Sequence, residues 1–348
     1  MTVNINPAIF TIGNFEVRWY GLMYVIGLVL ALFYLSKRFK RKDFIDEVKL
    51  PVDFEWDVIL WTAVGILVGA RLFFILVYDP KSILIPDAGL KGFTAVWNVL
   101  YKIINIRNGG LSFHGGLLGV VIATSLLMRY YYINFYKVAD IAVVIAPVGL
   151  FLGRIGNFIN GELWGRPTNL PWGMIFPNAD IGGQAVLRHP SQLYEALFEG
   201  LITFLILFFM DRYNRKHKKF KSGFIFWSFL FLYGFFRFFI EYTREPDQYY
   251  GWLIKNGFVL GGLTMGQILC LLMVLISVPM LILAQKCNYF DKRYAKFVEK
   301  NKDRIKKREE KYKIYMLQEE EKRKIHEKEK VKKLVAQQKL NKKKKKNR

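Results

Sequence analysis

The chain has 348 residues, of which 53% are hydrophobic and 16% aromatic, and its formal net charge is +24 at pH 7. The apolar residues gather in blocks of about twenty, the length of helix that crosses ~30 Å of hydrocarbon, so the composition indicates an integral membrane protein. Residues 291–348 hold 25 Lys and Arg and 10 Asp and Glu, which leaves a net charge of +9 for the first 290 residues and excludes a chain that is strongly basic throughout.

Seven apolar segments are predicted to span the membrane as helices. They cover residues 18–36, 56–77, 111–131, 138–158, 193–211, 223–242 and 264–285. Glycines and Pro147 interrupt the third and fourth segments, which membrane helices tolerate where neighbouring helices satisfy the freed backbone groups. We therefore expect an all-α membrane protein, a bundle of about seven transmembrane helices with external loops or short arms over its outer face.

The basic residues between these segments predict the orientation of the bundle, because Lys and Arg are enriched in cytoplasmic loops. Clusters at 37–42 and 212–221, the pair Arg129 and Lys137, and the tail from Lys286 fall on one side if there are seven spans. This places the N-terminus outside and the C-terminus in the cytoplasm. The external segments are then 78–110, 159–192 and 243–263.

The chain divides by composition into a transmembrane catalytic domain, residues 1–290, and a Lys- and Glu-rich cytoplasmic tail, residues 291–348. The tail is expected to be a solvated extension, partly helical or disordered. Alternatively, it is attracted to anionic lipid headgroups of the inner leaflet, at ~1 kcal/mol per basic residue near the surface. Only the basic charge of this tail would support nucleic-acid binding, and we do not expect that function.

The sequence contains no recognisable motif for binding a metal, a nucleotide or another cofactor. Cys270 and Cys287 form no CxxC pair, which argues against a disulfide framework, a zinc site or a catalytic thiol. Walker A, HExxH and GxSxG motifs are also absent from the sequence. The sequence predicts neither a metal site nor a cofactor.

Polar residues gather at the predicted outer ends of the apolar segments. Ionisable groups within a membrane span are costly and by default suggest a functional site. Five segments supply such residues: Tyr20, Arg71, His114, Arg154, Tyr233, Arg237 and Glu241.

In the sixth segment, Tyr233, Arg237 and Glu241 recur at i, i+4 and i+8, which is one face of a helix. A structural Arg–Glu pair that fixes helix packing is the alternative explanation of this stripe. His114 has a similar ambiguity, because a lone histidine is more often structural, although its neutral pKa suits proton transfer.

The stretch GRIGNFINGELWGR, residues 153–166, begins at the end of the fourth segment. If the helix continues to Asn160, then Arg154, Asn157 and Asn160 share one face; if it ends sooner, glycines let the chain turn and bring them together with Glu162. A guanidinium suits a phosphate, and asparagine amides can bind glycerol hydroxyls or ester oxygens. Arg154 and Arg237 could thus clamp one phosphate diester.

These motifs closely resemble those of the bacterial prolipoprotein diacylglyceryl transferases. Residues 153–165 match the family signature GRxGNFxNxExxG at every fixed position. Further matches, in family order, are RWYGLMY at 18–24, SFHGG at 112–116, RHPSQLYE at 188–195, YGxxRxxxE at 233–241 and MGQIL at 265–269. The resemblance covers about residues 5–285 and leaves out the tail.

The resemblance implies a seven-span transferase of the bacterial plasma membrane, with its active site near the outer leaflet. It would move the diacylglyceryl group of phosphatidylglycerol to the lipobox cysteine thiol of a prolipoprotein signal peptide. The product is a thioether, glycerol 1-phosphate leaves, and neither metal nor nucleotide is needed. An anionic-lipid transporter or flippase is the alternative, although transporter sites usually lie near the midplane between repeats.

The resemblance also implies roles for single residues. Arg154 would hold the headgroup phosphate, and Arg237 would stabilise the charge that develops on it. His114 would take the thiol proton, with Tyr233 as the rival base. Lipid-binding or arginine-orienting roles fall on Tyr20, Arg71, Asn157, Asn160, Glu162, Gly165 and Glu241. Ala70, where many relatives have glycine, makes close helix approach beside Arg71 less certain.

Overall fold

The structure is a computed structural model. It describes residues 1–325 except 14, 42–43, 45–47, 49–53, 79, 106–109, 178, 182, 246–261, 312, 316, 319–320 and 323, and within helices and strands it leaves undescribed the side chains at 12, 15, 77–78, 81–82, 113–114 and 265. The chain forms two compact units, Met1–Lys292 and Arg293–Arg348.

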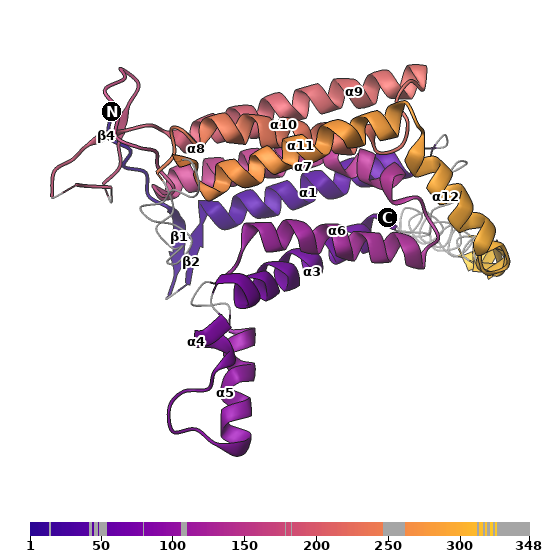
Figure 1. Cartoon of the computed structure of the whole chain (residues 1–348), viewed down its shortest axis with the longest axis horizontal. Helices are drawn as coiled ribbons and strands as arrows, with labels where there is room; N and C mark the ends of the chain where they lie inside the picture. The colour runs from indigo at the N-terminus through magenta and orange to yellow at the C-terminus, as the bar shows by residue number, and fades with distance from the viewer. Residues whose placement is uncertain are drawn as a thin grey trace, which may run out of the picture. The chain divides into compact units, whose positions relative to one another are not determined.

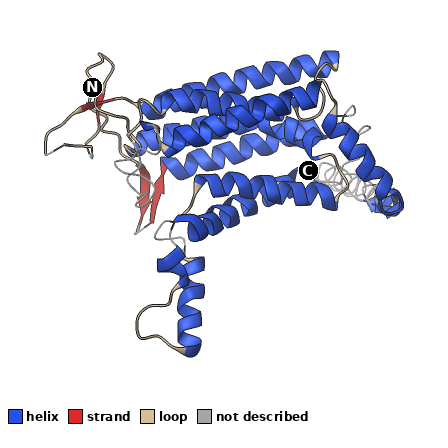
Figure 2. Cartoon of the chain, viewed as in Figure 1, coloured by secondary structure: helices blue, strands red, loops and turns tan. Residues whose placement is uncertain are grey.

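The first unit is a bundle of apolar helices at the predicted places (Figures 1 and 2). Its principal helices are α1 (Trp19–Phe39), α3 (Phe54–Phe73) with the π-helical η1 (Phe74–Tyr78), α6 (Phe113–Tyr130), α7 (Phe135–Asn160), α8 (Ser191–Glu195) running through the π-helical η2 (Ala196–Ile202) into α9 (Thr203–His217), α10 (Phe224–Ile240) and α11 (Met265–Gln285). Five helices are long and apolar enough to cross a membrane, and Gly115–Tyr130 and Phe224–Ile240 are shorter apolar helices. The prediction of an all-α membrane protein is confirmed.

Shorter elements lie before α1, in the predicted external segments and after α11. The antiparallel hairpin β1 (Ala8–Ile12) and β2 (Phe15–Arg18) precedes α1, and β3 (Met174–Ile175) pairs with β4 (Leu187–Arg188). The remaining helices are α4 (Pro80–Leu84), α5 (Gly92–Ile104) and α12 (Tyr289–Lys300). Figure 1 shows β1, β2 and α8 at one end of the helices of the first unit.

A glycine seam joins α3 to α6. A Cβ on Gly65 would lie 2.6 Å from the carbonyl oxygen of Gly119, and Gly69 contacts the backbone of Gly115 and Gly119 as closely. Small residues let membrane helices approach at backbone distance. Ala70 is buried beside this seam, so the alanine at this position does not prevent the close approach.

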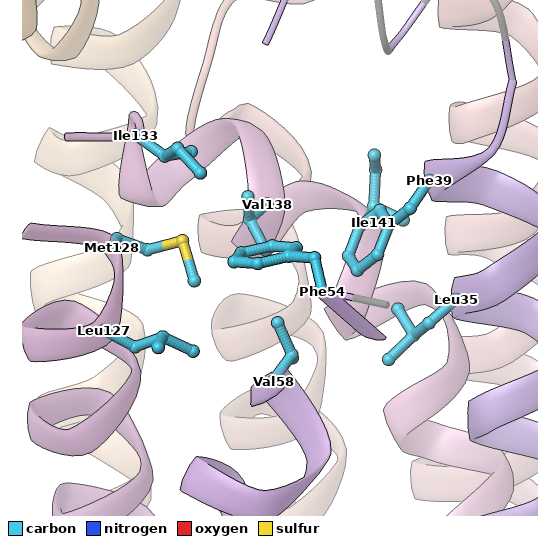
Figure 3. Packing of buried hydrophobic residues seen from close by; sticks show 9 residues of the cluster. All are labelled: Leu35, Phe39, Phe54, Val58, Leu127, Met128, Ile133, Val138 and Ile141. Atoms are coloured by element: carbon cyan, nitrogen blue, oxygen red, sulfur yellow. The ribbon is translucent and has the colours of Figure 1, made fainter. Parts of the chain in front are cut away.

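One apolar cluster, at the end of the bundle away from β1, β2 and α8, joins four helices. Side chains from α1, α3, α6 and α7, with one from the turn before α7, interdigitate in the cluster of Figure 3. Its members are Leu35, Phe39, Phe54, Val58, Leu127, Met128, Ile133, Val138 and Ile141. Because this core fixes α7 against α1 near its start, α7 is held as a rigid support for the polar residues at its C-terminal end.

Asp140, a charged residue within the fourth predicted segment, has a structural role. Its carboxylate accepts hydrogen bonds of 2.7 Å from the backbone nitrogens of Gly223 and Phe226, at the first turn of α10. The first amides of a helix lack partners within the helix and carry its positive dipole end, so a carboxylate stabilises them. Asp140 therefore holds the start of α10 against α7.

Candidate active site

The signature segment folds around Glu162. The helix α7 continues to Asn160, as the first of the two predicted alternatives required, and Gly161 follows at φ +64° in the left-handed region. The side-chain amides of Asn157 and Asn160 donate to Oε1 of Glu162, at 2.8 and 3.2 Å. Both asparagines thus hold the carboxylate that follows the turn.

Arg154 lies one turn before Asn157 and points to two buried carboxylates. Its Nε is 3.0 Å from Oε2 of Glu195, and its Nη2 is 4.0 Å from Oε2 of Glu199. Its side chain is 16% exposed, whereas both glutamates are at 0%. Within the described part of the chain, the terminal nitrogens of Arg154 have no hydrogen-bond acceptor, so this guanidinium keeps donors for a ligand.

Arg237 is more fully engaged than Arg154. Its Nη1 contacts Glu195 and lies 3.4 Å from Oε1 of Glu199, while Nη2 lies 3.1 Å from Oε2 of Glu241, one helical turn away. The structural Arg–Glu pair considered from the sequence is therefore present, and it is joined to the carboxylates that Arg154 contacts. The structure brings the two predicted arginines together around Glu195.

Three residues of this site were missed in the sequence. Glu195 ends the RHPSQLYE motif without a predicted role, Glu199 follows one turn later in an apolar segment, and Arg244 places Nη1 3.1 Å from Oε1 of Glu195. Two acids four residues apart in a membrane span were the available signal. We call Arg154, Glu195, Glu199, Arg237, Glu241 and Arg244 the Glu195 cluster. It holds three arginines and three glutamates.

Glu241 lies against the start of α11. Its Oε1 accepts a hydrogen bond of 3.1 Å from the hydroxyl of Thr264, which also caps α11 in a capping box with Gln267. Gly266 leaves room for this approach, since a Cβ there would lie 2.8 Å from Oε1 of Glu241. The positive end of the α11 dipole thus adds to Arg237 in stabilising the Glu241 carboxylate.

Gly165 is the last residue of the signature segment, in the loop after α7. Its amide donates to the carbonyl oxygen of His189 at 2.9 Å, and its own carbonyl accepts from Arg188 at 3.1 Å. A Cβ would collide with the carbonyl oxygen of Thr243 and lie 2.6 Å from Cβ of His189. Glycine is needed here because three chain segments meet at backbone distance.

The two predicted tyrosines lie on different helices of the site: Tyr20 beside the signature segment and Tyr233 beside the Glu195 cluster. Tyr20 packs on α7, where a Cβ on Gly156 would lie 2.8 Å from its ring, and its hydroxyl is 2.9 Å from that of Tyr24. Tyr233 lies one turn before Arg237 on α10 and is buried. The stripe of Tyr233, Arg237 and Glu241 therefore faces the protein interior as predicted.

Arg71 serves a different part of the molecule. Its guanidinium donates to the carbonyl oxygens of Ile103 and Gly110, at 2.9 Å each, and also to those of Lys102 and Asn105. These acceptors lie at and after the end of α5, so Arg71 ties that segment to α3. His114 is the second residue of α6, and its side chain lies outside the described residues.

His189 lies in the loop before α8, beside Gly165. Burial lowers the pKa of its imidazole, because desolvation disfavours the charged form. Its Nδ1 lies 3.3 Å from the hydroxyl of Tyr194, which accepts a hydrogen bond of 2.7 Å from the indole of Trp172. The imidazole of His189 is thus neutral at pH 7 and packs in the loop before α8.

Comparison with known proteins identifies the family. The model of the family "Prolipoprotein diacylglyceryl transferase" matches residues 7–283. The phosphatidylglycerol–prolipoprotein diacylglyceryl transferase of Rickettsia felis is 46% identical over 283 residues, 80% of this chain and 94% of the relative. The protein of the same name from Geobacter sulfurreducens is 44% identical over 283 residues, 81% of this chain and 96% of the relative.

The chain belongs to the prolipoprotein diacylglyceryl transferase family. The matched residues contain the whole Glu195 cluster and the signature loop, and the tail from 291 lies beyond them. The resemblance read from the motifs is confirmed, and with it a multi-pass membrane transferase.

Proposed function

We propose that this protein transfers the diacylglyceryl group of phosphatidylglycerol to the cysteine thiol of a prolipoprotein lipobox, the first step of lipoprotein maturation. The relatives' names give the two substrates and the transferred group. The observation that carries the proposal is the partly exposed guanidinium of Arg154, whose terminal nitrogens have no hydrogen-bond acceptor among the described residues and lie beside a buried ion cluster. A phosphate diester is the anion that such a planar fork binds well.

In the reaction the thiol sulfur attacks the glyceryl carbon that carries the phosphate. The bond between this carbon and its oxygen breaks, a thioether forms, and the electron pair leaves with glycerol 1-phosphate. Arg154 holds the phosphate, and Arg237 supplies the second positive charge beside the oxygen that becomes negative. Such electrostatic stabilisation is often the largest contribution of an active site.

The thiol proton must go to a base, since the thiolate is the nucleophile. His114 and Tyr233 are the two candidates. Tyr233 shares the buried face of α10 with Arg237. His114 starts α6, where glycines allow close approach to α3. Tyr20, Asn157, Asn160, Glu162, Gly165 and Glu241 act by shaping the lipid site or orienting the arginines.

The Glu195 cluster is proposed to face the outer leaflet of the bacterial plasma membrane, where both the phospholipid headgroup and the lipobox are accessible. The basic clusters that flank the opposite helix ends support this orientation. The signature loop and the β3–β4 layer then cover the site from the outside.

The test is transfer by the purified chain. Phosphatidylglycerol and a lipobox peptide should give a peptide heavier by one diacylglyceryl group, read by mass spectrometry. Arg154→Ala and Arg237→Ala should each abolish the product, because each removes a charge that the leaving phosphate requires. Near-parental transfer by both variants would refute the assignment.

The tail is proposed to bind anionic headgroups on the cytoplasmic leaflet. Its support is the net charge of residues 291–348 and the amphipathic sequence of α12. In nanodiscs with anionic lipid, amides of residues 301–325 should exchange more slowly than in neutral discs, and high salt should remove the difference. Equal exchange in both discs would limit the tail to a solvated extension.

A further inference from the structure

Glu199 is a fully buried carboxylate whose contacts are loose. Its Oε1 lies 3.4 Å from Nη1 of Arg237, and its Oε2 lies 4.0 Å from Nη2 of Arg154. Charge-assisted hydrogen bonds are usually ~2.7–2.9 Å long. Glu195, by contrast, contacts three arginines, with Arg154 at 3.0 Å and Arg244 at 3.1 Å. Glu195 is the firm anchor of the cluster, and Glu199 is the weakly held member.

The backbone around Glu199 is specialised. It lies in η2, where the hydroxyl of Thr203 donates to the carbonyl oxygen of Phe198, five residues back, at 2.7 Å. A Cβ on Gly200 would lie 2.6 Å from Cβ of Phe151, one turn before Arg154 on α7. Wide turns of this kind occur frequently at functional sites. Glu199 lies within this wide turn and has its contacts with Arg237 and Arg154 from there.

The charge of the cluster constrains what can bind. Its three arginines and three glutamates are balanced when all are ionised, so an incoming phosphate diester leaves one buried negative charge uncompensated. Burying an unpaired charge is costly, and such a group neutralises instead. Among the described carboxylates of the cluster, Glu195 and Glu241 have arginine contacts of 3.1 Å or shorter, whereas the shortest for Glu199 is 3.4 Å.

We propose that Glu199 is the exchangeable counter-ion of the lipid site: it neutralises Arg154 and Arg237 before the lipid binds, and it takes up a proton when the headgroup phosphate replaces it. Glu199 acts through the arginines and is a positioning residue. This inference rests on the proposed function, because it takes phosphatidylglycerol as the anion.

Among the residues that the structure describes, the groups that face Glu199 leave it as the proton acceptor. They are Glu195 on α8, Arg154 on α7, Arg237 and Tyr233 on α10, and Cys270 on α11. The arginines stay charged throughout, and neutral tyrosine and thiol groups cannot relieve a negative charge by gaining a proton. Glu195 is held by three arginines, which favours its charged form.

Binding of phosphatidylglycerol should therefore take up about one proton per lipid, so that the Kd rises with pH by up to ~tenfold per pH unit. We would measure the Kd of the full chain for phosphatidylglycerol in detergent micelles from about pH 5 to pH 8, with phosphatidylcholine micelles as the blank. A pH indicator in weak buffer would count the protons. A pH-independent Kd and no proton uptake would overturn the inference without any variant.

Glu199→Gln keeps the shape of the side chain and removes its charge. This variant should bind phosphatidylglycerol more tightly than the parent at pH 8 and lose the pH slope. Weaker binding with the slope retained would overturn the inference. His189→Gln controls for a nearby histidine and should keep the slope.

Arg154→Gln separates the inference from the proposed function. It should lose phosphatidylglycerol binding at every pH, and parental binding by this variant would refute the lipid site itself. If Arg154→Gln loses binding while Glu199→Gln keeps the parental slope, the inference about Glu199 alone fails.

Discussion

Arg71 and Arg154 are arginines at the ends of the second and fourth predicted spans, and both were expected to bind substrate. Their surroundings differ. Arg71 donates to four backbone carbonyl oxygens of the segment from Lys102 to Gly110. Arg154 has one short contact, to Glu195, and keeps its terminal nitrogens without a hydrogen-bond acceptor in the described part of the chain.

The two arginines differ in how many of their N–H donors are used by the groups around them. Fixed carbonyl oxygens use up the donors of Arg71 and attach one chain segment to another, which is a structural role. Carboxylates beside Arg154 hold its charge in a largely buried place and leave its terminal donors without a hydrogen-bond acceptor among the described residues. Arginine in a membrane span therefore indicates a ligand site only when its hydrogen-bonding capacity is incompletely used.

A large effect is expected from replacing the guanidinium of Arg154, and a small one from the same replacement at Arg71. Arg154→Lys should lower the kcat/KM of transfer by ~10²–10³, because an ammonium cannot replace the bidentate donors. Arg71→Lys should stay within about tenfold of the parent and should speed amide exchange in α5. A structural role for Arg71 would be refuted if Arg71→Lys lost as much activity as Arg154→Lys while the amide exchange of α5 was unchanged.

Removal of the base for proton transfer should give an effect at least as large. His114→Gln or Tyr233→Phe, whichever removes the base, should lower kcat by ~10²–10⁴. The measurement is kcat with saturating lipid and peptide, since loss of a base leaves the KM nearly unchanged. If His114→Gln transfers at the parental rate and Tyr233→Phe does not, the role belongs to Tyr233. Loss in neither variant would exclude both.

The sequence allowed the helices and the polar face of the sixth segment to be predicted, because both follow from local patterns; that Arg154 and Arg237 lie at one level of the membrane followed from the predicted orientation of the spans. Apolar blocks define the spans, and the i, i+4 spacing of Arg237 and Glu241 defines one helix face. The family motifs supplied the rest of the signature loop.

Other contacts depend on long-range packing. Arg244 reaches Glu195 only because the chain after α10 returns beside Gly165, and no local pattern contains that return. Glu195 and Glu199 carried a readable signal, two acids one turn apart in an apolar segment, but their arginine partners come from other helices. The carbonyl partners of Arg71 were invisible for the same reason, since α5 itself was expected only as an external segment.

A smaller effect is expected from the loop that closes the site. Gly165→Ala should destabilise the protein by ~1–3 kcal/mol, the usual cost of adding a methyl group to a packed place, since the new Cβ would collide with the chain at Thr243 and His189. Gly153→Ala is the matched control, because nothing lies within 4 Å of a Cβ there. Thermal unfolding in detergent compares the two. Equal Tm values would show that the loop accommodates the methyl group.

The smallest expected effect is a pH dependence of the segment that Arg71 holds. The pKa of the exposed Asp87 carboxyl is lowered by hydrogen bonds from Lys102 and Asn98 on α5. A lowered carboxyl pKa means that the contact stabilises the segment above the ordinary value of about 4 and that this contribution is lost as the pH falls through the lowered value. Intrinsic-rate-corrected amide exchange of residues 85–91 should therefore speed up on acidification below about pH 4, and Asp87→Asn should exchange with the same corrected rate at both ends of that range. Transfer at neutral pH should not change in Asp87→Asn, because the pair belongs to the segment of Arg71 and not to the Glu195 cluster. An activity loss in Asp87→Asn would show that the segment held by Arg71 also contributes to transfer at the Glu195 cluster.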